Sequence, residues 1–294
     1  MSFLYFLEGI RTPAGEVICQ IITYFGQEIL CLMLVCFMFW CMDKKTGYRM
    51  AFSFFLSSTV AQTLKLIFRI DRPWVIDPNF KPVDSALEAA TGYSFPSGHT
   101  QTATSVYGIM TVESRKWWAK ILWTLLFLAV GFSRMYLGVH QPKDVAVGLL
   151  VSLICIGGVY ALKPEEHKNW DPAVSVFLCI LAFASLAYDL YLFGNGVIDG
   201  AMAADTAKNS GGLAGFALAY YLERRYVDYQ TEGTVKQKAL RLILGLVSLG
   251  ILYVGLKMGF KALHFGMPGD FFRYFVLMLW AMLLYPVLFT KFKL

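Results

Sequence analysis

The feature that most constrains the fold is a series of long apolar segments separated by short polar turns. A helix that crosses the hydrocarbon core of a bilayer needs about 20 mostly apolar residues. Nine segments fit this description: 17–41, 49–69, 97–113, 117–136, 143–162, 172–193, 205–222, 238–258 and 270–290. The sequence therefore predicts an all-α, polytopic membrane helix bundle with about nine spans.

The composition agrees with this prediction. Hydrophobic residues make up 57% of the chain and charged residues 16%, whereas soluble domains carry roughly 25% charged residues. The segment 205–222 is the weakest of the nine, because polar residues occupy its start. Residues 1–16 hold a short apolar run with neither a basic start nor a clear cleavage site. We expect an interfacial helix there rather than a signal peptide.

The distribution of basic residues predicts the orientation of the chain in the membrane. Of the 26 lysines and arginines, 15 fall at span ends or turns that the nine-span order places on one side. They are Lys44, Lys45, Arg49, Arg115, Lys116, Lys120, Lys163, Lys168, Arg224, Arg225, Lys236, Lys238, Arg241, Lys291 and Lys293. Basic residues gather on the cytoplasmic side of membrane proteins. The N-terminus is therefore expected outside and the C-terminus in the cytoplasm.

The sequence contains no motif for a metal or a cofactor. The six cysteines lie in predicted spans and lack the spacing of zinc ligands, so we expect small core residues without disulfides. No cluster of Asp, Glu or Cys on the outer side is suited to hold a metal ion. The net charge of +6 is interpreted as a topology signal and not as affinity for nucleic acid.

Three polar motifs interrupt the apolar pattern, and the first ends the segment 49–69. Lys65 and Arg72 are seven residues apart, so a continuing helix places them on one face together with Arg69. Pro73 disfavours helix at Arg72 and is expected to end the helix there. A lone lysine would more simply extend to the lipid headgroups. The pair instead favours a functional site, because cations inside a span are costly.

The second motif opens the third predicted span. Ser94 is expected to cap the helix, and Pro96 fits its first turn. Ser97 and Gly98 would then offer backbone amides at a helix N-terminus, which suits an anion, and His99 stands beside that anion. A single histidine at a helix start is more often an ordinary interfacial residue. The adjoining Pro-Ser-Gly favours the functional interpretation.

The third motif lies between the fourth and fifth predicted spans. Arg134 ends one helix, and its planar set of donors suits a phosphate. Pro142 fits the first turn of the next helix, which places Asp144 four residues after His140. A carboxylate at that spacing can accept one imidazole N–H and leave the other nitrogen able to attack. All three motifs fall on the side away from the cytoplasm.

Taken in order, these motifs resemble the signature of the type 2 phosphatidic acid phosphatase superfamily. They are Lys65-x6-Arg72-Pro73, Pro96-Ser97-Gly98-His99 and Ser133-Arg134-x5-His140-x3-Asp144. The resemblance covers about 49–162 and matches the family in residue type, order and spacing. It implies a six-helix-type phosphatase core, which we expect over 17–193, and it leaves the C-terminal third unassigned. The apolar segments divide the rest into the interfacial segment 1–16 and a three-span extension over 194–294.

The resemblance also implies a role for each motif residue. His140 attacks phosphorus and forms a phosphohistidine, Asp144 orients and polarises His140, and His99 protonates the leaving oxygen. The groups that bind the phosphoryl oxygens are Lys65, Arg72, Ser97, Gly98 and Arg134. Three cations and a helix N-terminus can stabilise phosphoryl charge without a metal, so we expect metal-independent hydrolysis.

The sequence restricts the substrate less closely. A site at the outer membrane surface suits a lipid phosphate or diphosphate, such as polyprenyl diphosphate, phosphatidic acid or phosphatidylglycerol phosphate. The context of the second motif is similar to that of bacterial members, which indicates a bacterial cell membrane. The alternative is a soluble sugar phosphate, because nine spans in this orientation resemble the glucose-6-phosphatase branch.

Two interpretations from other classes carry less weight. Vanadium haloperoxidases share these motifs, but they are soluble. A transporter or lipid scramblase would show paired broken spans with inward polar residues in both halves. Here the polar chemistry is concentrated at three helix ends on one side. The oligomeric state is not specified by the sequence.

Overall fold

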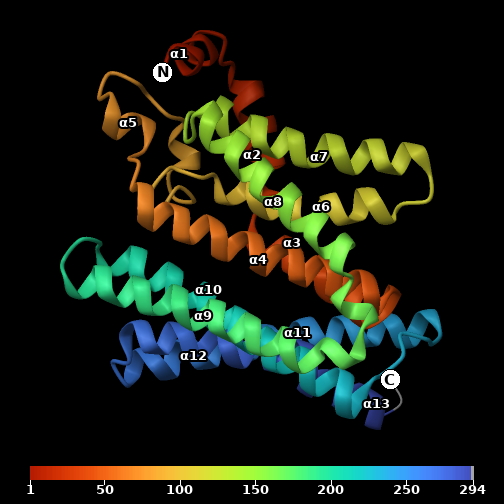
Figure 1. The fold of residues 1–294 in the computed structure, drawn as a ribbon. Coiled ribbons are helices and arrows are strands. Elements are labelled where there is room, and N and C mark those ends of the chain that lie inside the picture. The colour runs from red at the N-terminus through yellow and green to blue at the C-terminus, as the bar shows by residue number, and fades with distance from the viewer. Residues whose placement is uncertain (293–294) are drawn as a thin grey trace. The chain divides into compact units, whose positions relative to one another are not determined.

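The structure, a computed structural model, describes residues 1–292 as helices joined by loops, the longest of them over 77–97 (Figure 1). No β-strand occurs within that range. Six helices are long and apolar enough to cross a bilayer, and the number rises to seven if the bent pair α2 and α3 counts as one span. The chain is therefore an all-α integral membrane protein, as the sequence predicts.

The helices follow one another along the whole described chain. Their bounds are α1 (Ser2–Gly9), α2 (Pro13–Tyr24), α3 (Glu28–Phe37), α4 (Lys44–Phe68), α5 (Pro73–Ile76), α6 (Gly98–Glu113), α7 (Trp117–Tyr136), α8 (Pro142–Leu162), α9 (Asp171–Gly194), α10 (Gly200–Leu222), α11 (Val235–Ala262), α12 (Gly266–Leu279) and α13 (Tyr285–Lys291). Short π segments are η1 (Met38–Met42), η5 (Glu223–Val227) and η6 (Trp280–Leu284), and short 3₁₀ segments are η2 (Asp84–Ala86), η3 (Pro164–Glu166) and η4 (Lys168–Trp170).

All nine predicted segments are largely helical, but three of them differ from a single full span, the bent segment 17–41 and two others. Helix α6 has only 16 residues, and α10 begins with the polar residues that weakened the segment 205–222. Neither is among the helices that are long and apolar enough to cross a membrane by themselves. By length and composition, six or seven of the nine predicted spans are therefore able to cross a membrane.

The first predicted span, 17–41, is not one continuous helix. Helices α2 and α3 meet at an angle of 45°. Gly26 lies in the break, where an added Cβ would be 2.6 Å from Val130 Cγ1 and 3.0 Å from the His99 carbonyl oxygen. The bend therefore lets the backbone pass close to α6 and α7, a tertiary contact that hydropathy alone does not reveal.

One compact unit comprises residues 1–32 and 52–161. Within it α6 packs against α7, and α2 packs against α7. Gln101 Nε2 donates to Ser57 Oγ at 2.7 Å, and Ser152 Oγ donates to the Gln101 carbonyl at 2.9 Å. Such interhelical hydrogen bonds satisfy polar side chains inside a membrane bundle. They join α4, α6 and α8, which carry the three motifs.

The segment before the first span is folded onto the same unit. Leu4 and Leu7 of α1 are fully or almost fully buried, and they belong to an apolar cluster with Phe80 and Leu137. Arg11 Nε donates to the Tyr136 carbonyl at 2.9 Å. The N-terminal residues therefore contact the loop that follows α7, in which the third motif lies.

A second compact unit comprises residues 33–51 and 162–294, described here to residue 292. Its central helix is α10, which packs against α9 and α12. A Cβ at Gly211 would overlap the Phe271 carbonyl oxygen, and one at Gly215 would lie 2.5 Å from the Phe275 carbonyl oxygen. Small residues allow such close helix contacts in membranes, and the glycines of the seventh predicted span serve this purpose.

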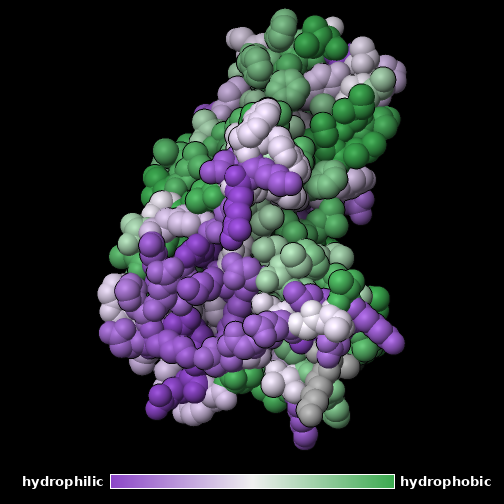
Figure 2. Space-filling model, turned by 90° about the vertical axis from the view of Figure 1, so that its right-hand side faces the viewer, coloured by the Kyte–Doolittle hydropathy of each residue, from purple (hydrophilic) through white to green (hydrophobic). Residues whose placement is uncertain are grey.

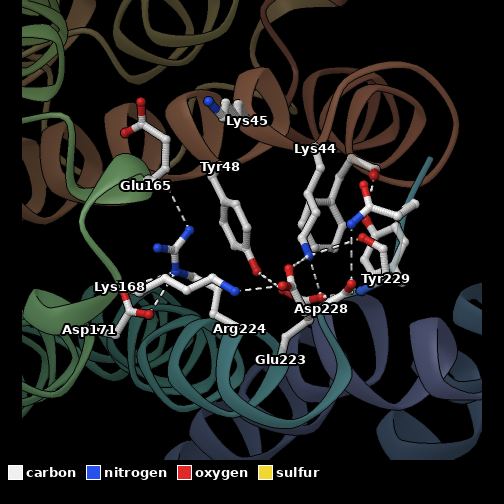
Figure 3. A network of polar contacts seen from close by, with 12 residues as sticks. Lys44, Lys45, Tyr48, Glu165, Lys168, Asp171, Glu223, Arg224, Asp228 and Tyr229 are labelled. Carbon is white, nitrogen blue, oxygen red and sulfur yellow. Dashed lines mark hydrogen bonds and ion pairs between the residues drawn. The ribbon is translucent and has the colours of Figure 1, made fainter. Parts of the chain in front are cut away.

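A network of ion pairs links several helix ends within the second unit (Figure 3). Lys44 Nζ lies 2.7 Å from Glu223 Oε1, and the Tyr48 hydroxyl also donates to the Glu223 carboxylate. Arg224 Nε donates to Asp171 Oδ2 at 2.8 Å. The network joins the start of α4, the start of α9 and η5, the π segment that follows α10, and its buried charges are paired as the low dielectric requires.

The surface of the molecule is apolar over much of its area. Figure 2 shows apolar side chains beside a patch of hydrophilic ones on the face in view. On α11 the exposed apolar residues recur along the whole helix: Val235, Leu240, Ile243, Leu244, Val247, Ile251, Val254 and Met258. Exposed apolar area of this extent marks a surface that lipid covers.

Candidate active site

The first motif begins at the end of α4 and continues in the loop behind it. The helix ends at Phe68, and Arg69 has a φ of +46°. This left-handed conformation stops the helix, and Arg69 Nη1 turns back to the Leu66 carbonyl at 2.6 Å. The prediction that the helix continues to Arg72 and places Lys65, Arg69 and Arg72 on one face is therefore wrong.

Arg72 nevertheless reaches the third motif. Its Nη1 lies 2.9 Å from His140 Nε2 and 3.0 Å from the Val139 carbonyl oxygen. Its Nε donates to the Gly92 carbonyl at 3.0 Å, and its Nη2 donates to the Thr91 carbonyl at 2.6 Å. The side chain is 6% exposed. The guanidinium is thus held in one position by carbonyls from two loops.

The contact with Arg72 assigns the tautomer of His140. A guanidinium can only donate, so Nε2 accepts and the proton of the neutral ring is on Nδ1. Nδ1 lies 3.5 Å from Asp144 Oδ2 and 3.5 Å from Ser94 Oγ. Burial, followed by the charges of Arg72 and Arg134, holds the pKa of His140 well below 6.5. The imidazole is therefore neutral at pH 7, with the Nε2 lone pair directed at the cations.

Asp144 is positioned from three directions. Its Oδ2 accepts from Ser94 Oγ at 2.5 Å and from the Gln141 amide at 2.8 Å. Its carbonyl accepts from the Ser97 amide at 3.0 Å. The carboxylate is fully buried, and Oδ1 has no hydrogen-bond partner in residues 1–292. The second and third motifs are therefore joined by direct hydrogen bonds.

The start of α6 differs from the sequence prediction by three residues. The helix begins at Gly98, and its cap is Ser97, whose hydroxyl accepts from the Thr100 amide at 3.5 Å. Ser94 does not cap it, and Pro96 precedes the first turn. The prediction was wrong because the Ser94 hydroxyl bonds to Asp144, a partner 50 residues away that local sequence does not indicate.

The N-terminus of α6 still presents backbone amides beside a cation. The Ser97 amide is used by the Asp144 carbonyl, so its predicted availability to an anion is wrong. The amides of Gly98 and His99 are the first two of the helix and have no carbonyl partner one turn back. A Cβ at Gly98 would lie 3.9 Å from Lys65 Nζ. Lys65 therefore lies over the position at which an anion would approach Gly98.

Arg134 and His99 contribute buried polar atoms that lack partners. Arg134 is fully buried, and Nη1 donates to Thr23 Oγ1 at 2.9 Å. Its Nε and Nη2 have no acceptor in the described part of the chain, and His99 Nε2 is likewise buried without a partner. Unpaired buried donors are costly. The two Arg134 nitrogens can bind an anion, and His99 Nε2 can donate a proton.

Sequence reasoning found most of these groups but missed two. The structure brings Arg72, His140 and Asp144 into direct contact, and the charges of Lys65, Arg72 and Arg134 all act on His140. Ser94 and Thr23 were not assigned to the site, although Ser94 lies beside the second motif. Thr23 is on α2, far from any motif, and no local pattern distinguishes it.

Comparison with known proteins gives two family matches. Residues 46–168 match the PAP2 superfamily. Residues 207–294 match a transmembrane extension of PAP2 superfamily phosphatases. The first match contains every site residue that the sequence predicted, but not Thr23, and the second covers most of the second compact unit.

Individual relatives cover parts of the chain. An undecaprenyl-diphosphatase of Sulfolobus acidocaldarius is 33% identical over 110 residues, which are 37% of this chain and 50% of that protein. Sphingosine-1-phosphate phosphatase 1 of Mus musculus is 25% identical over 209 residues, which are 66% of this chain and 45% of that protein. The chain thus spans about half the length of these relatives. The crystal structure of Aquifex aeolicus LpxE has 26% identity and a TM-score of 0.48, and the match covers 55% of this chain and 93% of that one.

Proposed function

The chain belongs to the PAP2 superfamily, the type 2 phosphatidic acid phosphatases, and on that premise we propose that it hydrolyses phosphoric esters or diphosphates in a membrane. The observation that carries the proposal is the buried contact of Arg72, His140 and Asp144, with Arg72 Nη1 2.9 Å from His140 Nε2. This contact holds a neutral imidazole, its carboxylate partner and a phosphate-binding cation together. Such an arrangement suits nucleophilic attack on phosphorus.

The proposed reaction has two steps. His140 Nε2 attacks phosphorus and forms an N–P bond while the bond from phosphorus to the leaving oxygen breaks, and His99 gives that oxygen a proton. Water then attacks the phosphohistidine, His99 takes a proton from this water, and His140 leaves with Nδ1 still protonated. Asp144 stabilises the positive charge that develops on the His140 ring.

The phosphoryl oxygens are bound by cations and amides. Arg72 and Arg134 supply guanidinium donors, and Lys65 supplies an ammonium beside Gly98. A phosphoryl group that enters between Arg72 and His140 would replace the ring nitrogen as the acceptor of Nη1. The same movement would bring phosphorus to Nε2. Binding of the phosphoryl group by Arg72 would then also align phosphorus with Nε2 for attack.

We expect the rate of phosphate release to be unchanged in excess chelator. Three cations and the first amides of α6 neutralise the charge that a metal ion neutralises in other phosphatases. The measurement compares initial rates of the purified protein with and without chelator, after identical dialysis. A rate that falls in chelator and returns with added Mg²⁺ would contradict this part of the proposal.

We expect a bell-shaped dependence of the rate on pH. Burial and the neighbouring cations keep the pKa of His140 well below 6.5, so the rate rises with pH through an acidic limb that lies below pH 6.5, as the nucleophile loses its proton. The rate falls again when His99, held protonated by the bound phosphoryl charge, loses its own proton. A rate that rises steadily to high pH would exclude His99 as the acid.

The proposed substrate is a lipid phosphate or diphosphate. The relatives named above are a diphosphatase of undecaprenyl diphosphate and a phosphatase of sphingosine 1-phosphate, and both names describe lipid substrates. Polyprenyl diphosphate, phosphatidic acid and phosphatidylglycerol phosphate remain the candidates. The alternative is a soluble sugar phosphate, as in the glucose-6-phosphatase branch, and a transporter or scramblase is the third interpretation.

The proposed topology has nine spans in a bacterial cell membrane. The N-terminus lies outside, the C-terminus lies in the cytoplasm, and the site faces away from the cytoplasm. In this topology α6 and α10 are shorter or more polar spans that neighbouring helices shield from lipid; both are largely buried. The division into the segment 1–16, a six-helix-type core over 17–193 and an extension over 194–294 is part of the same proposal.

The test measures phosphate release from a polyprenyl diphosphate, phosphatidic acid and glucose 6-phosphate, in detergent and in chelator. The variant His140→Ala accompanies each substrate. Release from the lipids alone would support the proposed substrate class. Comparable release from glucose 6-phosphate would favour the sugar phosphatase instead. No release from any of them, with the variant and the parent alike, would contradict an enzymatic function, and lipid movement in liposomes unaffected by His140→Ala would favour the scramblase.

A further inference from the structure

The hairpin formed by α9 and α10 has a defined register. Ser175 Oγ donates to the Ala217 carbonyl at 2.8 Å, and Arg224 Nε donates to Asp171 Oδ2 at 2.8 Å. These contacts pair the start of α9 with the end of α10 and with η5 directly after it, as an antiparallel hairpin requires. Two helices paired in this way approach the connecting turn together, so residues near the end of α9 face residues near the start of α10.

This register places four polar residues at matching levels of the two helices inside the second unit. Ser185 and Asp189 are one turn apart on the buried stripe of α9. Thr206 and Ser210 are one turn apart on α10, at the same distance from the turn, and Thr206 faces Asp189. Asp189, Thr206 and Ser210 are fully buried, and Ser185 is 7% exposed.

Most polar atoms of this cluster have no partner. Ser185 Oγ and Ser210 Oγ make no hydrogen bond to any residue in the described range, and the Thr206 hydroxyl is the one group in that range that faces the Asp189 carboxylate, whose oxygens are otherwise without a partner. Thr206 Oγ1 has one long contact, 3.5 Å to the Met202 carbonyl oxygen. By contrast, Asp205 on the same helix is paired with Lys208 at 2.7 Å and is partly exposed.

Unpaired oxygens in this position favour a bound ligand. A buried polar group without a partner bears the full penalty of its lost hydration, and the penalty is larger for a carboxylate. Ionisable groups inside a membrane bundle usually mark an ion or substrate site. The carboxylate repels an anion. A divalent cation of the calcium class needs six to eight oxygens, usually from several carboxylates, whereas this cluster holds one carboxylate and three hydroxyls.

We propose that Ser185, Asp189, Thr206 and Ser210 form a binding site for a monovalent alkali cation, of the sodium class, between α9 and α10. One positive charge balances one carboxylate, and hydroxyl oxygens complete the hard-oxygen ligand set that such ions prefer. Asp189 is five residues from the end of α9, roughly 8 Å along the helix axis. The adjoining turn at 195–196 is exposed.

The test is the melting temperature of the whole purified protein in NaCl and in choline chloride at equal ionic strength. A ligand that binds only the folded state stabilises it by mass action, so sodium is expected to raise Tm by about 4 °C or more at saturation. In Asp189→Asn, which keeps the side-chain volume, Tm is expected to be the same in both salts. Equal melting temperatures of the parent in the two salts would overturn the proposal.

Two further variants make the test specific. Asp205→Asn removes the same charge one residue from Thr206 but leaves the cluster intact, so it is expected to keep the sodium-dependent shift. Loss of the shift in that variant would mean a general salt effect and would overturn the proposal. Ser210→Ala keeps the carboxylate and is expected to need more NaCl for half of the shift. It also provides the test if Asp189→Asn does not fold.

Direct binding gives an independent measurement. Radioactive sodium is expected to bind to the parent at one ion per chain and to be absent from Asp189→Asn, while Asp205→Asn binds as the parent does. If Tm in choline chloride depends on pH and sodium neither binds nor changes Tm, the carboxylate holds a proton instead, and the proposal fails.

Discussion

Replacing His140 with alanine is expected to lower the rate of phosphate release by a factor of about 10⁴ or more. The change removes Nε2, the atom held 2.9 Å from Arg72 and the only one that the proposed reaction uses to bond phosphorus. The cations would still bind phosphate, so the loss is expected in kcat and not in KM. Steady-state rates with the preferred lipid substrate measure both constants.

His140→Ala needs controls because the side chain is 2% exposed and accepts a hydrogen bond. His140→Asn keeps more of the volume and an acceptor, and it is expected to be equally inactive. His167→Ala removes a histidine that is exposed and packs at a tilt against Trp170 in the other compact unit, and its rate is expected to equal that of the parent. Substantial release by a correctly folded His140→Ala protein would mean that another group attacks phosphorus.

Replacing Asp144 with asparagine is expected to lower kcat by a factor of about 10³–10⁴, with little change in KM. The carboxylate requires a proton on Nδ1, which leaves the Nε2 lone pair able to attack. An asparagine amide can donate to Nδ1 and so favours the tautomer with the proton on Nε2, where it blocks attack. The neutral asparagine also cannot offset the positive charge that develops on the His140 ring.

Ser94→Ala is the matched comparison for Asp144→Asn. It removes the 2.5 Å hydrogen bond to Asp144 Oδ2 but keeps the carboxylate and the 2.8 Å bond from the Gln141 amide. Its loss of kcat is therefore expected to be near 10-fold, because the orientation is weakened while the charge stays. The imidazole NMR signals of His140 report the tautomer. An Asp144→Asn protein with normal kcat and unchanged signals would contradict the assigned role.

The sequence predicted the bounds of the helices around the site closely where local residues mark both ends of a helix. The segments 117–136 and 143–162 correspond to α7 and α8 with a difference of at most one residue at each end. The apolar runs and Pro142 mark these ends locally, so hydropathy and a single proline are enough. Motif order then predicted that the candidate residues lie at helix ends on one side, and the structure brings three of them, Arg72, His140 and Asp144, into contact.

Other features of the site depend on contacts between distant parts of the chain. The left-handed Arg69 ends α4 before Pro73, and the Ser94 hydroxyl bonds to Asp144 rather than capping α6. Thr23 reaches Arg134 from α2, over a separation of 111 residues. The bend at Gly26 lies where the backbone passes close to α6 and α7. Periodicity and capping rules describe neighbours in sequence, so none of these contacts could be predicted from them.

The measurement that tests the central claim most directly is the capture of the phosphorylated enzyme. The protein is mixed with substrate that carries a radioactive terminal phosphoryl group, quenched within the first turnover and digested. The account predicts one labelled peptide, with the label on His140, stable in alkali and lost in acid, and it predicts no label in His140→Ala. Label on another residue, or rapid phosphate release with no labelled protein at any time, would contradict a reaction through His140.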